Sequence, residues 1–149
     1  MSSAPQIADL IVKAFNKGNK LLICGNGGSA AEAQHMAAEL VGRFEHERRA
    51  LPAIALTTDT SILTAWSNDH DFSDVFRRQI EALGHSGDVL LAISTSGKSV
   101  NVLKALTFAQ ERGLFTLDLP REGTSTPEIQ ENQLKLIHEI CREIEKEFI

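Results

Sequence analysis

His35 and Glu39 are the first residues whose types and spacing could carry chemistry. They stand four apart in the stretch 34–39, so in a helix they share one face. An imidazole and a carboxylate on one face can bind a divalent metal, or one can hydrogen-bond to the other. From the spacing alone, an ordinary interaction on the surface of a helix is the commoner outcome.

Gln130 and His138 form a second pair, eight residues apart near the end of the sequence. In a helix this spacing separates them by about 12 Å along the axis. Both could bind one ion only if long side chains reached toward each other or the helix bent. Spacing alone therefore gives this pair little support as shared metal ligands.

Two polar turns offer a different chemistry, the binding of an anion. Residues 25–29 (Gly-Asn-Gly-Gly-Ser) and 94–99 (Ser-Thr-Ser-Gly-Lys-Ser) each follow a short apolar run and precede a helix-forming stretch. Glycine lets the backbone approach a ligand closely, and the free N–H groups at a helix N-terminus favour negative charge. The second turn adds four hydroxyl groups and Lys98, which suit phosphate or a polyol. Neither turn has the spacing of a Walker A loop or of GxGxxG, which disfavours a nucleotide; tight turns and helix caps are the alternative.

Asn68 and Asp69 stand between two predicted helices. Their side chains could contact a sugar hydroxyl, or one of them could cap the helix that follows. The pattern alone favours the cap.

The elements that must position these residues alternate between strand and helix. Apolar runs predict strands at 21–24, 53–57, 89–93 and 114–119, and helical spacing predicts helices over 7–15, 30–40, 61–66, 72–83, 100–112 and 127–148. Strands that are almost continuously apolar indicate a parallel sheet covered on both faces. We therefore expect a doubly wound α/β sandwich, with one domain over residues 1–149, a leading helix and a long final helix. In such sheets ligands bind outside the carboxyl ends of the strands, where both polar turns lie.

Composition narrows the function classes. Lys and Arg number 15 and Asp and Glu 20, a net charge of −5, which argues against a broad surface for nucleic acid or for an anionic membrane. Cys24 and Cys141 stand far apart without metal-ligand spacing, which favours a reducing compartment. The start of the sequence lacks the pattern of a signal peptide, and no run approaches the ~18 apolar residues of a membrane span. We expect a cytoplasmic protein with neither nucleic acid nor membrane as a partner.

The ordered set of motifs resembles the phosphoheptose isomerases, or sedoheptulose-7-phosphate isomerases, of the sugar isomerase (SIS) domain group. The resemblance covers about residues 20–106 and continues from 124 to the end. It is carried by Cys-Gly-Asn-Gly-Gly-Ser at 24–29, His35-x3-Glu39, Asn68-Asp69, Gly-Asp-Val at 87–89, Ser-Thr-Ser-Gly-x-Ser at 94–99 and Ile-Gln-x7-His at 129–138.

This resemblance implies a flavodoxin-like three-layer sandwich that assembles as a cytoplasmic homotetramer. It implies conversion of sedoheptulose 7-phosphate to D-glycero-D-manno-heptose 7-phosphate, the first step toward ADP-heptose and the heptose of bacterial lipopolysaccharide. The implied metal is one zinc per subunit, held by His35, Glu39, Gln130 and His138. The implied substrate-binding residues are Asn26, Gly27, Gly28, Ser29, Glu39, Asn68, Asp69, Ser94, Thr95, Ser96, Ser99 and Gln130.

Ketose–aldose exchange through an enediol suits these residue types. It needs a base beside the two reacting carbons and an acid for their oxygens. We expect Glu39 to be the base and His138 to move protons on the other side. A glutamate that binds a metal firmly loses basicity, so we rank the role of Glu39 as a base above its role as a ligand. Whether zinc would polarise the carbonyl or only organise the site stays open at this point.

The sequence also departs from the family pattern. Only about twenty residues precede the first strand, and the segment 117–123 is abrupt where relatives carry a further strand and a glycine-rich loop. Either the chain is a shortened variant or disordered residues are omitted from the sequence. Omission is favoured, because loss of a strand would expose its neighbour's edge. Gln133 stands where relatives commonly have histidine, which weakens the site assignment slightly, and Lys98 stands where asparagine is common.

The main alternative is a non-catalytic SIS-domain adaptor that binds the bacterial replication initiator. The stretches 47–59 and 82–95 look closer to that paralogue than to the typical enzyme. However, the paralogue has lost the glutamate and the final histidine, whereas Glu39 and His138 are both present here. A complete site favours the isomerase.

Overall fold

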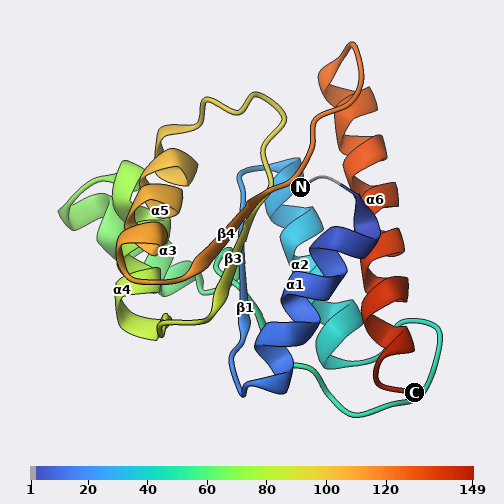
Figure 1. Ribbon diagram of the computed structural model, residues 1–149. Coiled ribbons are helices and arrows are strands. Elements are labelled where there is room, and N and C mark those ends of the chain that lie inside the picture. Colours follow the sequence, from blue (N-terminus) through green and yellow to red (C-terminus); the bar gives the residue numbers. More distant parts are fainter. Residues whose placement is uncertain (1–2) are drawn as a thin grey trace.

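The computed structural model describes residues 3–149, so residues 1 and 2 of the predicted domain lie outside the described residues. Helices and strands alternate along the chain, as Figure 1 shows. The helices are α1 (Ala4–Asn16), α2 (Gly28–Val41), α3 (Thr60–Asp69), the 3₁₀ helix η1 (Phe72–Asp74), α4 (Val75–Leu83), α5 (Val100–Glu111) and α6 (Thr126–Lys146). The strands are β1 (Leu21–Cys24), β2 (Ala53–Ala55), β3 (Val89–Ala92) and β4 (Phe115–Asp118).

The four strands form one parallel sheet in the order β2-β1-β3-β4. In this register Leu21 of β1 stands opposite Ala53 of β2 on one side and Val89 of β3 on the other. From β1 the chain crosses to β2 at one edge, and from β3 it crosses to β4 at the other edge. The direction of winding therefore reverses between β1 and β3, and the crevice at their carboxyl ends is where open α/β sheets bind ligands.

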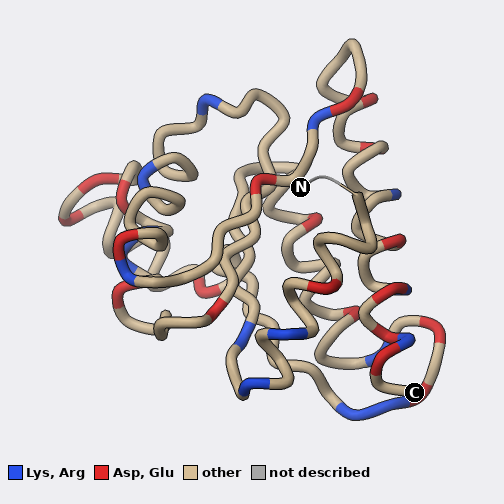
Figure 2. The backbone as a smooth tube through the Cα atoms, in the orientation of Figure 1, with Lys and Arg blue, Asp and Glu red and all other residues tan. Residues whose placement is uncertain are grey.

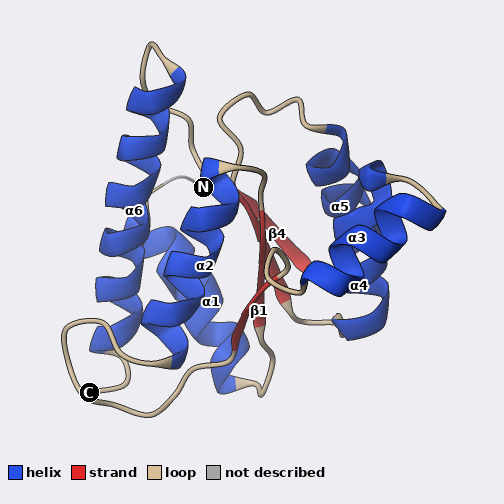
Figure 3. Ribbon diagram, turned by 180° about the vertical axis from the view of Figure 1, so that it is seen from behind, coloured by secondary structure: helices blue, strands red, loops and turns tan. Residues whose placement is uncertain are grey.

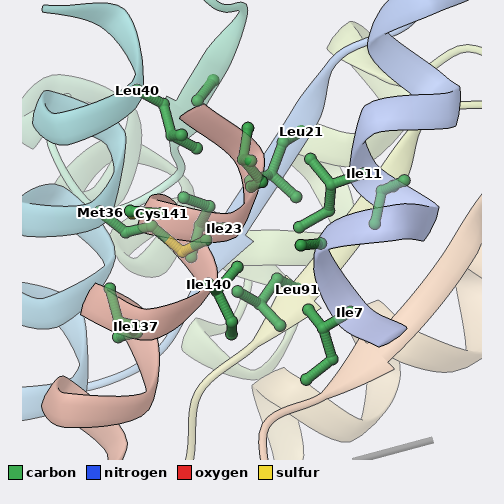
Figure 4. Packing of buried hydrophobic residues seen from close by; sticks show 14 of the residues in the cluster. Ile7, Ile11, Leu21, Ile23, Met36, Leu40, Leu91, Ile137, Ile140 and Cys141 are labelled. Atoms are coloured by element: carbon green, nitrogen blue, oxygen red, sulfur yellow. The ribbon is translucent and has the colours of Figure 1, made fainter. Parts of the chain in front are cut away.

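Helices cover both faces of the sheet, which gives three layers (Figure 3). Helices α1, α2 and α6 pack on one face against Leu21, Ile23 and Leu91, whereas α4 and α5 pack on the other against Leu22 and Cys24. Figure 4 shows the first of these cores, in which aliphatic side chains of α1 and α6 pack over the same face of β1. Full burial of each such side chain contributes about 1.5–3 kcal/mol. The predicted doubly wound parallel sandwich is confirmed.

Most predicted elements are found, with differences at their ends. The helix predicted over 72–83 is divided, because the Asp71 carboxylate accepts a hydrogen bond from the Ser73 N–H at 2.8 Å and holds the first turn as η1. Helix α3 begins at Thr60 and not at Ser61, because Asp59 caps it by accepting from the Ile62 N–H at 3.0 Å. Strand β2 is two residues shorter than predicted.

Strand β4 lies at the edge of the sheet and runs directly into α6 through residues 119–125. Phe115 and Asp118 on β4 are exposed, as expected of an edge without a further strand. Figure 2 shows acidic and basic residues interspersed along the helices and loops. None of the helices in residues 3–149 combines the length and the apolar composition that a membrane crossing requires.

Candidate active site

The turn after β1 lies against the end of β3. A Cβ on Gly25 would stand 2.7 Å from the Ile93 carbonyl oxygen, so only glycine fits this close approach. Gly27, the residue before α2, has a φ of +57°, a left-handed conformation that favours glycine. The Ile93 N–H donates to the Cys24 carbonyl at 2.9 Å. The glycine turn and the serine loop (residues 94–99) therefore lie side by side at the crevice between β1 and β3.

A pair of carboxamides joins these two loops. Asn26 donates to Asn101 at 2.8 Å, and Asn101 donates back to Asn26 at 2.9 Å. Asn101 is buried at the start of α5 and is not among the predicted site residues. The available signal was a polar residue in the first turn of a helix that follows the serine loop directly.

Hydroxyl groups of the serine loop partly shape the loop itself. The Ser94 hydroxyl accepts from the Gly97 N–H at 3.0 Å, and the Ser96 hydroxyl accepts from the Lys98 N–H at 3.1 Å. Within the described residues, the hydroxyls of Thr95 and Ser99 have no hydrogen-bond partner. All four hydroxyls thus retain a proton to donate, and the loop opens helix α5, an arrangement that suits a phosphate.

His35, Glu39 and His138 come together between α2 and α6. The Nε2 atoms of the two histidines are 2.8 Å apart, and the Glu39 Oε2 lies 3.8 Å from the His35 Nε2. One ligand atom from each of the three residues falls within 4.8 Å of the others. The side chains are partly exposed, 43% for His35 and 23% for Glu39, so a substrate can reach them. Two imidazoles and a carboxylate are a donor set that suits zinc.

Gln130 lies two helical turns away from this cluster, beside the glycine turn. A Cβ on Gly28 would overlap the Gln130 carboxamide. Together with Glu32, Gly28 and Gln130 line a cavity of about 260 Å³. Glu32 is only 8% exposed, and its Oε1 has no hydrogen-bond partner among the described residues. Burial raises the pKa of Glu32 to about 7. Glu32 is not among the predicted site residues, because a glutamate in a helix is usually solvated.

Asn68 and Asp69 are exposed at the end of α3, where Asn68 donates to Asp69 at 3.0 Å. The interpretation of this pair as a cap for the next helix is wrong. Asp71, two residues later, caps η1 with its side chain. Helix α3 extends through Asp69, so both residues lie within its last turn and the cap of the next helix falls at Asp71.

Comparison with known proteins adds independent findings. Residues 2–119 match the family model described as SIS domain. The chain is 55% identical to the phosphoheptose isomerase of Pelobacter propionicus, covering 95% of this chain and 85% of that protein. It is 52% identical to the one from Synechocystis, covering 93% and 80%. The first of these alignments spans 161 positions, more than the 149 residues of this chain, so the relative carries residues with no counterpart here.

Solved structures agree with these relatives. The phosphoheptose isomerase GmhA from Neisseria gonorrhoeae superposes with a TM-score of 0.87 at 42% identity, covering 96% of this chain and 85% of that one. A phosphoheptose isomerase from Francisella tularensis superposes with a TM-score of 0.88 at 35% identity and the same coverage. The matched sequence and the matched fold extend over nearly the whole chain, and the chain therefore belongs to the phosphoheptose isomerase family of SIS-domain proteins.

Proposed function

We propose that this protein isomerises sedoheptulose 7-phosphate to D-glycero-D-manno-heptose 7-phosphate by proton transfer through an enediol. The observation that carries the proposal is the convergence of His35, Glu39 and His138 from the two helices α2 and α6. The relatives and solved structures described above are named as isomerases, and they give the adaptor alternative no support.

The phosphate end of the substrate binds at the crevice between β1 and β3. N–H groups at the start of α2 and α5 and the hydroxyls of the serine loop supply donors to the phosphate oxygens. These donors compensate for the net negative charge of the protein, and Lys98 lies in the same loop. The residues that we assign to substrate binding are Asn26, Gly27, Gly28, Ser29, Asn68, Asp69, Ser94, Thr95, Ser96, Ser99 and Gln130, together with Glu39.

Glu39 removes the proton from the carbon next to the carbonyl, and His138 moves protons at the substrate oxygens. The partial exposure of Glu39 lets it reach a bound sugar. His138 faces it across the helix pair and is fixed in part by the Phe44 ring, whose centroid lies 5.4 Å away. General acid–base assistance of this kind contributes roughly 10² to 10⁴ in rate.

His35, Glu39 and His138 would hold one zinc per subunit, with Gln130 as a fourth ligand. The cluster supplies nitrogen and oxygen donors, and the cavity beside Gln130 leaves its side chain room to move. When bound, zinc would polarise the substrate carbonyl and stabilise the negative charge of the enediolate that proton removal produces.

Substitution of Glu39 by glutamine tests the chemical assignment. The amide cannot take up the proton, so we expect turnover of sedoheptulose 7-phosphate to fall by at least about a hundredfold with the fold intact. Circular dichroism and thermal unfolding check the fold. If Glu39 acts as base more than as ligand, the variant keeps most of its metal; unchanged turnover would contradict the role of base.

Substitution of His35 by alanine tests the metal assignment. We expect near-stoichiometric zinc in protein purified without chelators and loss of that zinc in the variant, measured by elemental analysis. His85→Ala is a matched control, because His85 is exposed in the loop before β3, outside the cluster. Active wild-type protein without bound metal would exclude the ligand set.

We further propose that residues 1–149 act as one SIS domain, in the cytoplasm, within a homotetramer whose product feeds heptose synthesis for lipopolysaccharide. Support for assembly comes from α3, which buries none of its residues within the chain, and from the exposed Ile62 and Phe72 on and beside it. Light scattering after size-exclusion chromatography measures the oligomeric state. A monomer at micromolar concentration would contradict the tetramer.

A further inference from the structure

Gln133 ties α6 to the serine loop. It lies one turn after Gln130 on α6 and is only 1% exposed. Its Nε2 donates to the Ser94 carbonyl at 3.1 Å and to the Pro120 carbonyl at 3.3 Å. One amide therefore joins the long final helix to the ends of both β3 and β4.

The residue that Gln133 holds begins the proposed phosphate-binding loop. The Ser94 hydroxyl closes the loop by accepting from the Gly97 N–H, and Gly97 has a φ of +69°. The Arg121 guanidinium packs on Gly97, where a Cβ would stand 2.8 Å from its carbon Cζ. Arg121 is itself fixed by two bonds to the Asp118 carboxylate, at 2.8 and 2.9 Å. The loop is thus fixed at its first residue and at its glycine.

The same helix carries His138, five residues after Gln133. A sugar phosphate places its phosphate at one end and its reacting carbons at the other, so the two binding regions must keep a fixed separation. A displacement of the serine loop from this separation weakens the hydrogen bonds that the loop donates to the phosphate, and so lowers the affinity for the substrate. Gln133 donates a side-chain hydrogen bond from α6 to this loop, and this bond sets the separation.

We propose that Gln133 is a positioning residue that fixes the serine loop relative to His138 and so determines the affinity for the phosphate group of the substrate. The inference rests on the proposed function and deepens it. Gln133 is too deeply buried to touch the substrate, and it acts through the Ser94 carbonyl.

Gln133→Met tests the proposal, because methionine keeps the length of the side chain and removes the N–H donor. The matched control is Gln79→Met. Gln79 is also buried, and its Nε2 donates to two carbonyls, those of Leu56 at 3.0 Å and Val75 at 3.1 Å, on the opposite face of the sheet. Both variants lose two hydrogen bonds of the same kind, so they share any general loss of stability.

We expect Gln133→Met to raise KM for the sugar phosphate about tenfold, the equivalent of one lost charge-assisted contact to the phosphate, with kcat changed less than about twofold. Competitive inhibition by inorganic phosphate weakens by the same factor, and zinc content stays as in the wild type. Gln79→Met leaves KM and the inhibition constant unchanged. Gln133→His, which restores a ring N–H donor, recovers part of the loss.

An unchanged KM in Gln133→Met would overturn the proposal, because the loss of the hydrogen bonds would then have no effect on substrate affinity. An equal rise of KM in Gln79→Met would also overturn it, because the effect would then come from general destabilisation. An inactive wild type would instead refute the proposed function. In that case thermal unfolding with inorganic phosphate still tests Gln133: phosphate must stabilise the wild type and Gln79→Met more than Gln133→Met. If phosphate stabilises none of them, the proposal fails as well.

Discussion

Helices α2 and α6 pack side by side, and a buried glutamate lies at each end of the pair. Within the described part of the chain, one of the two carboxylates has hydrogen-bond partners for both oxygens, and the other does not. At the end near the C-terminus, Glu145 is 2% exposed and accepts hydrogen bonds from the N–H groups of Phe44, Glu45 and His46 at 2.8–3.0 Å. The Arg48 Nε forms an ion pair with it at 3.1 Å. We call this region the closed end; Figure 2 shows acidic and basic residues gathered there.

At the other end, beside the glycine turn, Glu32 is nearly as buried, yet its Oε1 has no partner among the described residues. We call the region of Gly28, Glu32 and Gln130 the open end. Burial alone would raise the pKa of either carboxyl, and it does so for Glu32. At Glu145 the N–H groups of Glu45, Phe44 and His46 and the charge of Arg48 outweigh burial and lower the pKa. The fully paired Glu145 carboxylate stabilises the fold, whereas the Glu32 Oε1, which the described residues leave without a partner, is free to accept a hydrogen bond from a ligand.

The largest expected effect is at the closed end. Glu145→Gln leaves the Arg48 guanidinium buried without its counter-charge, so we expect a loss of about 3–5 kcal/mol in the free energy of unfolding, measured with urea. Glu143→Gln, two residues earlier on α6, removes only an exposed ion pair with Lys146 and should cost less than about 1 kcal/mol. Equal losses of unfolding free energy in the two variants would contradict the special role of the buried Glu145.

The closed end also predicts the response to acid. Because the pKa of Glu145 is lowered in the folded state, its stabilising contribution is present above the unfolded pKa and is lost as the pH falls through the folded one. Wild-type protein should therefore lose stability in acid more steeply than Glu145→Gln. Parallel acid unfolding curves of the two proteins would contradict this.

The second effect is at the open end and has the opposite sign. The pKa of Glu32 is raised from 4.5 to about 7, so its contribution is present below pH ~4.5 and is lost as the pH rises through about 7. We expect the free energy of unfolding of Glu32→Gln, relative to that of the wild type, to be about 1–2 kcal/mol higher at pH 8 than at pH 5. This value is reduced to allow for solvent screening from the adjoining cavity. Glu131→Gln, an exposed residue of the same cavity, should show no such gain in urea unfolding at the two pH values.

The smallest effect on stability is expected at Gly28. The new Cβ of Gly28→Ala meets the end of the flexible Gln130 side chain, which can turn away, so the cost should stay below about 1 kcal/mol. Displacement of Gln130 should nevertheless weaken zinc binding about tenfold, as measured by competition with a chelator. Zinc affinity equal to that of the wild type would remove Gln130 from the ligand set.

Periodicity predicted the fold because its signals are local. The apolar strand 21–24 and the glycine turn after it indicate the parallel sheet without reference to distant residues. The proximity of His138 to His35 is not a local property, because it depends on how α6 packs on α2. The separation of eight residues between Gln130 and His138 contains no information about this packing. Glu32 and Asn101 escaped notice for the same reason, since only tertiary contacts distinguish a buried polar side chain from a solvated one.

The reciprocal amide pair of Asn26 and Asn101 makes the rim of the crevice move as a single unit. Neither loop can move away without breaking both bonds at once. Among residues 3–149, each carboxamide keeps one Nδ2 hydrogen that makes no hydrogen bond. A ligand that enters the crevice therefore finds the glycine turn and the start of α5 already joined by hydrogen bonds. Binding does not have to order the two segments separately.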